Sequence, residues 1–152
     1  TYEITDFAQK IRTNTDLEPV ARHGKKPQIL QFNNEKEELS AIKKLIVTHQ
    51  ASAYKSLGIV CKTESQAYEM AEKLQIPDIH FLSNQSSAFV QGIVITSAHM
   101  AKGLEFNEVI IPQVDDKNYH SEIDRSMLYV AATRAMHRLT LTYSGTKHTP
   151  FI

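Results

Sequence analysis

The sequence predicts an α/β fold in which a parallel sheet is covered by helices on both faces. Two observations lead to this prediction. Short segments that are apolar throughout, such as 56–61 and 92–97, alternate with longer segments whose apolar residues recur at helical spacing. Strands without polar alternation are typical of a parallel sheet that is buried on both sides. The length of 152 residues, of which 41% are apolar, suits a single domain over residues 1–152.

Helices are predicted over 1–11, 34–50 and 63–76. Thr1, Asn34 and Thr63 stand where a side-chain oxygen can accept a hydrogen bond from the first turn of each helix. Gln66, three residues after Thr63, completes the pattern of a capping box. Pro77 ends the third helix, because proline cannot continue one.

A fourth helix is predicted to begin at Ile123. One of its faces carries four residues separated by steps of 4, 3 and 4, namely Ile123, Met127, Val130 and Arg134. We expect the three apolar residues to be buried against the sheet and to anchor the helix. Arg134 would then project at the edge of the domain, without a task inside the domain itself.

Strands are predicted over 28–32, 56–62, 79–83, 92–97, 107–113 and 138–144. The intervening segments 12–27, 84–91, 98–106 and 114–122 are predicted to be loops or irregular. In open parallel sheets, ligands bind beyond the carboxyl ends of the strands. We therefore expect the functional residues in the segments that follow strands.

The composition limits the possible functions. Seventeen basic residues balance 17 acidic ones, so any nucleic-acid contact has to be local. No apolar run approaches the roughly 20 residues of a membrane span, and no signal-peptide pattern opens the chain. The first residue is Thr1, which suggests a fragment of a longer protein or a processed chain. Cys61 is the only cysteine, which favours a cytoplasmic setting, and the scattered histidines predict no metal site.

Residues 97–106 combine a turn with several polar groups. Gly103 falls where the backbone must turn between two predicted strands, and His99, Lys102 and Glu105 surround it. These residue types fit a ligand site at a sheet edge. They also fit a solvated connector whose glycine serves only the turn.

Two segments resemble motifs of a known family. TSAHMAKGLEFNEVIIP (96–112) is similar to motif V of the UvrD/Rep-like superfamily 1 helicases, T-x-H-x-x-K-G-L-E-F before an apolar strand. EIDRSMLYVAATRAMHRLTLTYSG (122–145) resembles motif VI, E-x-x-R-x-x-x-Y-V-A-x-T-R-A. TYEITDFA at the start is similar to the residues that trail the Y-R-S-T of motif IV. The spacing looks most like the HelD-like branch, because it leaves no room for the extra 2B domain of Rep and UvrD.

The resemblance implies a RecA-like domain, called 2A, of the P-loop NTPase type. In the family, ATP lies between domains 1A and 2A, and Arg134 matches the motif VI arginine that reaches the γ-phosphate. A permanently charged guanidinium suits the charge on a transferring phosphoryl group. Gly103 and Glu105 match motif V positions that approach the nucleotide, the glutamate through the ribose hydroxyl. The simpler alternatives are a cation at a helix C-terminus for Arg134 and a surface carboxylate beside Lys102 for Glu105.

Other matched positions imply contacts with nucleic acid. Ser97 and His99 match positions that contact the single strand or relay between strand and nucleotide. Ser97 stands where the family often has threonine, and it keeps the hydroxyl. Lys102 is a candidate contact to the phosphate backbone, with a solvated lysine as the alternative.

Further matched positions are expected to support the structure. Arg125 matches the first motif VI arginine and is expected to pair with a carboxylate, whereas Tyr129 and Thr133 are expected to pack or cap. The sequence departs from the family at Ser126, which replaces a second arginine. The motif IV arginine would immediately precede Thr1.

The cofactors implied by the family are ATP and Mg²⁺, held mainly by domain 1A. The chain contains no G-x-x-x-x-G-K-[ST] phosphate loop. We therefore expect no cofactor in the isolated chain and no ATP hydrolysis by it.

Three functions are compatible with these observations. The leading hypothesis is the C-terminal motor domain of an ATP-dependent DNA helicase or translocase, with domain 1A of the same chain and single-stranded DNA as partners. An alternative is the motor domain of a HelD-like transcription factor that uses ATP to act on RNA polymerase, which the neutral charge also fits. A third is a RecA-like domain that only binds a partner.

Overall fold

The computed structural model describes residues 1–12, 23–83 and 91–152, so most of the predicted loops 12–27 and 84–91 lies outside the described residues. Within these residues a six-stranded sheet has the order β1-β6-β5-β2-β4-β3, and each neighbouring pair is parallel. The strands are β1 (Gln28–Phe32), β2 (Ser56–Cys61), β3 (Ile79–Phe81), β4 (Gly92–Ser97), β5 (Phe106–Ile111) and β6 (Ala135–Ser144). The predicted parallel sheet is confirmed.

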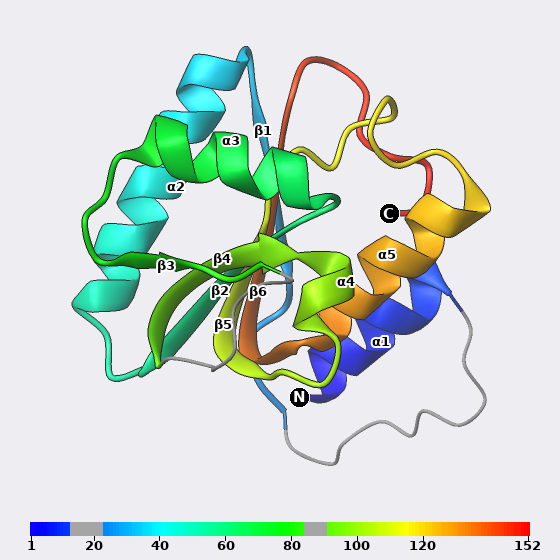
Figure 1. The fold of residues 1–152 in the computed structure, drawn as a ribbon. Coiled ribbons are helices and arrows are strands. Elements are labelled where there is room, and N and C mark those ends of the chain that lie inside the picture. Colours follow the sequence, from blue (N-terminus) through cyan, green and yellow to red (C-terminus); the bar gives the residue numbers. More distant parts are fainter. Residues whose placement is uncertain (13–22, 84–90) are drawn as a thin grey trace.

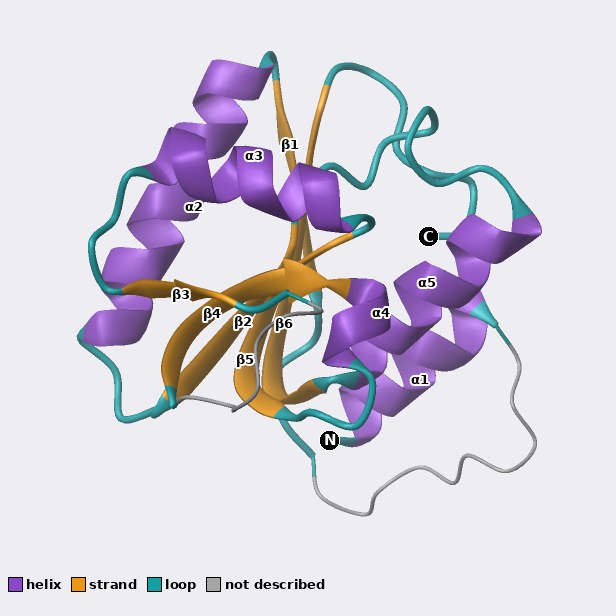
Figure 2. Ribbon diagram, in the orientation of Figure 1, coloured by secondary structure: helices purple, strands orange, loops and turns teal. Residues whose placement is uncertain are grey.

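Helices cover both faces of this sheet, as Figures 1 and 2 show. The helices are α1 (Tyr2–Ile11), α2 (Glu35–Gln50), α3 (Glu64–Leu74), α4 (Ala98–Ala101) and α5 (Glu122–Thr133). One hydrophobic cluster joins α1, α4 and α5 to the sheet, and a second joins α2 and α3 to it. Successive residues of β5 alternate between them, because Val109 and Ile111 belong to the first cluster and Ile110 to the second.

The predicted helix caps are present. The Thr1 hydroxyl accepts a hydrogen bond from the Ile4 N–H, and the Asn34 side chain accepts one from the Glu37 N–H at 2.9 Å. At the start of α3, Thr63 and Gln66 form a complete capping box. These caps satisfy backbone donors that have no partner inside the helix, so local sequence sets where each helix begins.

The expectation about the buried face of α5 is wrong. Ile123 is 70% exposed, and Met127 and Val130 are only half-buried. The buried face lies one residue further along, with the same spacing of 4, 3 and 4, at Asp124, Leu128, Ala131 and Ala135. The two stripes are about 100° apart on the helix. Asp124 belongs to the buried stripe because its carboxylate closes the capping box at the start of α5, a use that apolar periodicity does not reveal.

Two other boundaries differ from the prediction. The segment that was expected to be irregular begins with the short helix α4, and β6 begins three residues earlier than the predicted Arg138. The early start of β6 matters for the site, because it pairs Ala135 with Phe106 at the first residues of β6 and β5. The segments just before these two strands therefore meet at the amino edge of the sheet.

Candidate nucleotide-contacting site

Arg134 is held at the junction of α5 and β6. It is the C-cap of α5, and its main-chain carbonyl accepts a hydrogen bond from the Phe106 N–H at 2.9 Å. Its guanidinium donates from Nε to the Val130 carbonyl at 3.1 Å and from Nη1 to the Leu104 carbonyl at 3.2 Å. Arg134 thus links the segment that resembles motif VI to the segment that resembles motif V.

The guanidinium keeps capacity for a ligand. Nη2 donates to the Thr133 hydroxyl at 3.3 Å, so three of the five N–H donors of Arg134 are engaged. The residue is half-buried, and two of its five N–H donors have no acceptor among the described residues. The expectation that Arg134 has no task within the domain is therefore wrong, because it binds two carbonyl groups and a hydroxyl. Those contacts fix the direction of the charge.

Gly103 and Glu105 flank the carbonyl that receives Arg134. Both are exposed, and they precede β5 in the same short segment as Leu104. Gly103 has a φ of +81°, a left-handed conformation that side chains with a Cβ rarely adopt. The turn glycine and the exposed Glu105 therefore flank, in the chain, the residue whose carbonyl accepts from Arg134.

This group lies at the amino edge of the sheet, and the expectation of a site at the carboxyl edge is wrong for it. Arg134 precedes β6, and Gly103 and Glu105 precede β5. The carboxyl-edge rule describes ligands held within one open sheet. Here the exposed Gly103 and Glu105 and the half-buried Arg134 stand at the opposite end of the sheet.

The residues predicted to contact nucleic acid sit on the connection between β4 and β5. Ser97 is buried and its hydroxyl accepts a hydrogen bond from the Met100 N–H at 3.3 Å as the N-cap of α4. His99 and Lys102 are exposed. Ser97 ends β4 at the carboxyl edge of the sheet, so it is separated from Arg134 by the length of a strand. His99 and Lys102 remain accessible to a ligand, whereas Ser97 acts on the backbone of its own helix.

The residues expected to support the structure do make contacts of that kind. The Thr133 hydroxyl donates to the Val130 carbonyl at 3.0 Å and accepts from Arg134, so it orients the guanidinium. Tyr129 packs against the first hydrophobic cluster. Arg125 lies 3.5 Å from the exposed Glu122 carboxylate and stacks 4.5 Å from the Phe151 ring. Thr133 thus contacts the Arg134 guanidinium as well as the backbone of its own helix.

The N-terminal end of α5 is held by electrostatics. Burial pushes the pKa of Asp124 upward, but backbone N–H groups of His120 and Ser121, the Ser121 hydroxyl and nearby Lys62 outweigh it and bring the pKa below its ordinary value. The Lys62 ammonium lies 3.4 Å from the Asp124 carboxylate. This anchor fixes the start of the helix whose other end carries Arg134.

Beside α5 runs a shallow apolar groove. It encloses about 170 Å³ between α4 and α5, and its lining includes His99, Lys102, Ile123, Met127 and Val130. Val130 also supplies the carbonyl that accepts from Arg134 Nε. The stripe that sequence periodicity assigned to the core is therefore only partly buried, with Ile123 exposed at one end and Val130 next to Arg134 at the other.

Comparisons with known proteins find helicase domains that are similar to this chain. Residues 78–146 match the family model of the UvrD-like helicase C-terminal domain. DNA helicase II of Escherichia coli (strain K12) is 29% identical over 107 residues, which cover 59% of this chain and 15% of that protein. Gabija protein GajB of Bacillus cereus (strain VD045) is 43% identical over 58 residues, which cover 38% of this chain and 12% of that protein. The chain therefore spans only a small part of the length of these relatives.

A solved structure extends the similarity to the whole fold. The C-terminal domain of a possible DNA helicase from Lactobacillus plantarum WCFS1 superposes with a TM-score of 0.82 at 26% identity, covering 99% of this chain and 89% of that one. The sheet and its helices define a RecA-like α/β domain. Within that class, residues 78–146 are similar to the UvrD-like helicase C-terminal domain, in agreement with the family that the motifs indicated.

Metal-binding clusters and membrane spans are both missing from the described part of the chain. Among residues 1–12, 23–83 and 91–152, no group of three or more histidine, cysteine, aspartate or glutamate side chains is placed to hold a metal ion. Over the same ranges, no helix is both long enough and apolar enough to cross a bilayer.

Proposed function

We propose that this chain is the second motor domain of an ATP-dependent, UvrD-like DNA helicase or translocase, and that Arg134 is its arginine finger. The observation that carries the proposal is the fixed, half-buried guanidinium of Arg134 at the amino edge, with N–H donors left over. Phosphate oxygens are the ligands that a planar, permanently charged group binds best. The exposed Glu105 beside it can accept a hydrogen bond from a ribose hydroxyl.

The nucleotide would be shared with a neighbouring RecA-like domain. Arg134, Gly103 and Glu105 form one edge of a site and no phosphate loop is present in the sequence. Domain 1A, which holds ATP and Mg²⁺ in this family, would supply the other edge. When bound, the nucleotide and its metal supply the phosphoryl group and the charge that neutralises it. This chain's contribution is to place a guanidinium, oriented by Thr133 and the Leu104 carbonyl, against the γ-phosphate.

The groove between α4 and α5 supports the placement of that neighbour. Ile123 is 70% exposed, and with Met127 and Val130 it forms an apolar stripe that ends at Arg134. A domain that brings a γ-phosphate to Arg134 would also cover this stripe and remove its apolar surface from water. His99 and Lys102, on the opposite wall, would then lie at the margin of the interface, within reach of a bound single strand.

The test is a turnover measurement on the full-length protein. Arg134→Ala should lower kcat for DNA-stimulated ATP hydrolysis by about 10³-fold or more while changing the KM for ATP far less. Arg134→Lys should restore little, because an ammonium cannot reproduce the fork of the guanidinium. An unchanged kcat in Arg134→Ala would contradict the proposal and favour a domain that only binds a partner. The separate 152-residue chain should show no ATP hydrolysis.

The position within the family stays a prediction. The neutral net charge is compatible with a HelD-like factor that acts on RNA polymerase. Pull-down of the full-length protein with RNA polymerase, compared with its affinity for single-stranded DNA, decides between the two partners. Tight polymerase binding with weak DNA binding would favour the transcription factor.

A further inference from the structure

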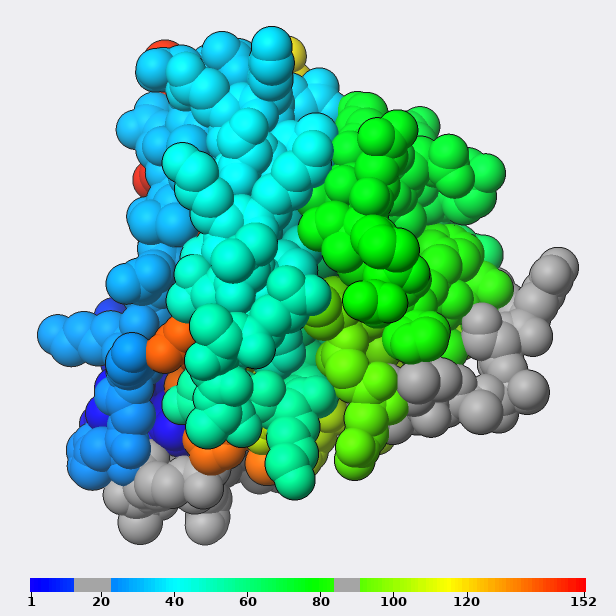
Figure 3. All heavy atoms as spheres, turned by 90° about the vertical axis from the view of Figure 1, so that its left-hand side faces the viewer, coloured from blue at the N-terminus to red at the C-terminus, as the bar shows by residue number. Residues whose placement is uncertain are grey.

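We propose that the buried carboxylate of Glu108 is a positioning residue for Arg134 and acts on it through Arg138. Glu108 lies in β5 and Arg138 in β6, on the face of the sheet that α2 (cyan) covers in Figure 3. The Arg134 side chain bonds α5, which packs on the opposite face, so the connection has to run through the strands. The inference deepens the proposed function and rests on it, because it concerns how the guanidinium that would meet the phosphate is kept in place.

β6 contains an irregularity between Arg134 and Arg138. Ala135 pairs with Phe106 and Arg138 pairs with Glu108, so the register advances by three residues in β6 but by two in β5. One residue of β6 is therefore extra, which is the arrangement of a β-bulge. A bulge interrupts the ladder of main-chain hydrogen bonds that otherwise holds two strands in register. The first residues of β6, and Arg134 just before them, therefore need a further constraint to stay aligned with β5.

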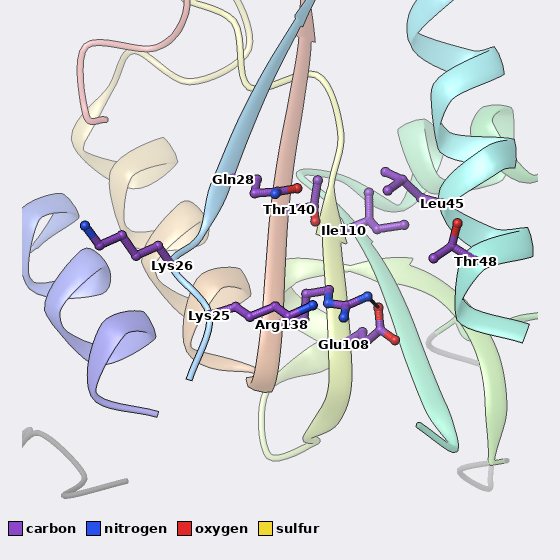
Figure 4. Close-up of a pocket in the computed structure, with 9 residues that line it drawn as sticks. All are labelled: Lys25, Lys26, Gln28, Leu45, Thr48, Glu108, Ile110, Arg138 and Thr140. Carbon is purple, nitrogen blue, oxygen red and sulfur yellow. Dashed lines mark ion pairs between the residues drawn. The ribbon is translucent and has the colours of Figure 1, made fainter. Parts of the chain in front are cut away.

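Glu108 supplies that constraint on the far side of the bulge. Its Oε2 lies 3.6 Å from Arg138 Nη1, and its Oε1 lies 3.1 Å from Nδ1 of His49 in the last turn of α2. Figure 4 shows the Arg138 guanidinium directed at the Glu108 carboxylate. The side chains of Glu108 and His49 are 8% and 5% exposed, so dissolved salt screens these contacts little. One carboxylate thus ties β5, β6 and α2 together.

Aromatic packing holds the bulge itself. The Arg138 guanidinium stands 5.5 Å from the centre of the Tyr54 ring, a cation–π contact. The ring of His137, which lies between Ala135 and Arg138, stacks on Tyr54 with 5.4 Å between the ring centres and 13° between the planes. Because both contacts fix side chains at the bulge, a shift of Arg138 would carry with it the main chain that leads back to Arg134.

On the near side of the bulge, the main chain of Arg134 is tied to β5. Its carbonyl accepts a hydrogen bond from the Phe106 N–H at 2.9 Å. β5 is in turn fixed to β2, because the Asn107 N–H donates to the Ser56 hydroxyl at 2.8 Å. Phe106 and Glu108 are thus two fixed points of β5 that together define the path of β6 across the bulge.

Loss of the Glu108 charge would remove the second of these points. Arg138 would then lack its carboxylate partner, and its side chain, which is 26% exposed, could turn toward water. The start of β6 would be free to move relative to β5. Hydrogen bonds weaken steeply as their geometry departs from linear, so a small movement is enough to release the Arg134 guanidinium from its two carbonyl acceptors. The expected effect is a loss of direction at Arg134 in a domain that stays folded.

Hydrogen exchange of the Arg134 Nε–H measures this loss on the 152-residue chain, by proton–nitrogen NMR at one fixed pH. Arg134→Lys assigns the signal by removing it. Glu108→Gln keeps the size of the side chain but not its charge, and it should speed the exchange of this Nε–H roughly tenfold. Ile42→Ala is the control, because it leaves a cavity in the second hydrophobic cluster under the same helix. It should leave the exchange rate at Arg134 unchanged.

A double-mutant cycle tests whether Glu108 acts through Arg138. Arg138→Gln should speed the exchange as much as Glu108→Gln does, and the variant with both substitutions should be no faster than either. Arg138→Gln also decides the matter should Glu108→Gln unfold the chain, because Arg138 is the more exposed partner. The proposal is overturned if the exchange in these variants is no faster than in Ile42→Ala. Effects that multiply in the double variant would overturn it too, because they would show that the two residues act independently.

Turnover of the full-length protein separates this inference from the proposed function. Glu108→Gln should lower kcat for ATP hydrolysis about 10- to 100-fold with a smaller change in the KM for ATP, as expected for a misplaced catalytic group. On an Arg134→Ala background it should have no further effect, and an additional loss there would contradict the proposal. If Arg134→Ala itself left kcat unchanged, the proposed function would fail, whereas the exchange of the Arg134 Nε–H would still decide whether Glu108 positions that side chain.

Discussion

The Nη1 atom of Arg134 donates to the main-chain carbonyl of Leu104, 30 residues earlier, at 3.2 Å. The two residues belong to segments that resemble different helicase motifs, and this hydrogen bond joins them within one domain. It makes Arg134 a structural residue of the isolated domain as well as a candidate finger for a nucleotide.

Arg134→Ala should therefore lower the free energy of unfolding of the 152-residue chain by about 1–2 kcal/mol, because two main-chain carbonyls lose a charged donor. Urea denaturation followed by circular dichroism measures the change. Arg12→Ala is the matched control: the Arg12 guanidinium also bonds a hydroxyl, that of Ser126, but at an exposed site. Its loss should cost about 0.5 kcal/mol or less. Equal effects of the two substitutions would show that the contacts of Arg134 do not stabilise the domain.

Leu128 and Ile123 test which face of α5 is buried. Leu128 is fully buried and Ile123 is 70% exposed. Leu128→Ala should lower the free energy of unfolding by about 2–5 kcal/mol, because it leaves a cavity in the core. Ile123→Ala should change it by about 0.5 kcal/mol or less. A larger loss for Ile123→Ala than for Leu128→Ala would show that the face with Ile123 is the buried one.

Gly103 and Gly58 should both resist substitution by alanine, but for different reasons. A Cβ at Gly103 would meet no atom within 4 Å, so the only cost comes from its φ of +81°. The substitution should lower the free energy of unfolding by about 1–2 kcal/mol. A Cβ at Gly58 would lie 2.6 Å from the Phe106 ring, and overpacking of this kind costs about 1–3 kcal/mol. Thermal denaturation measures both losses. Adding Phe106→Leu should reduce the loss caused by Gly58→Ala and leave the loss caused by Gly103→Ala unchanged.

Glu38 should make stability depend on pH. It is 2% exposed, and its carboxylate accepts hydrogen bonds from the Gln113 N–H at 2.9 Å and from the Thr142 hydroxyl. Burial raises its pKa above the ordinary 4.5, and these two hydrogen bonds offset that rise only in part. The folded state therefore holds the proton more tightly than the unfolded state, and stability falls as pH rises from 4.5 through the raised pKa.

Glu38→Gln should remove this dependence, because glutamine still accepts both hydrogen bonds but does not ionise. We expect a Tm that is equal to or higher than that of the wild type at about pH 7, with a flatter curve of Tm against pH above 4.5. Glu37→Gln on the exposed side of the same helix is the control and should leave the curve unchanged. If the Tm of Glu38→Gln at neutral pH were instead lower than that of the wild type, the charge itself would stabilise the fold.

The sequence was sufficient to predict the fold because its signals are local. Caps at Thr1, Asn34 and Thr63 and the apolar strands each act within a few residues, so their effects can be read without knowing the rest of the structure. The exception was α5, where two stripes with identical spacing compete. The capping box that Asp124 forms with Ser121 places Asp124 on the buried stripe. An analysis of apolar periodicity misses this, because it treats aspartate only as a polar residue.

The site was less predictable because its geometry depends on contacts between distant segments. The motifs identified Arg134, Gly103 and Glu105, but nothing in their residue types indicates that the Leu104 carbonyl is the acceptor. The amino-edge position follows from the register of Phe106 with Ala135, which is a property of the folded sheet. Arg138 carried one signal, a charge within an apolar strand, but its partner Glu108 lies on a different strand.

The acceptors that hold the Arg134 side chain are mainly peptide carbonyls, those of Val130 and Leu104. Exchanging the side chain at either position leaves the oxygen in place. The direction of the guanidinium is thus set by the path of the main chain rather than by the side chains of the neighbouring residues. Related sequences can drift at residues 104 and 130 and still point the same charge in the same direction, provided that the turn at Gly103 is kept.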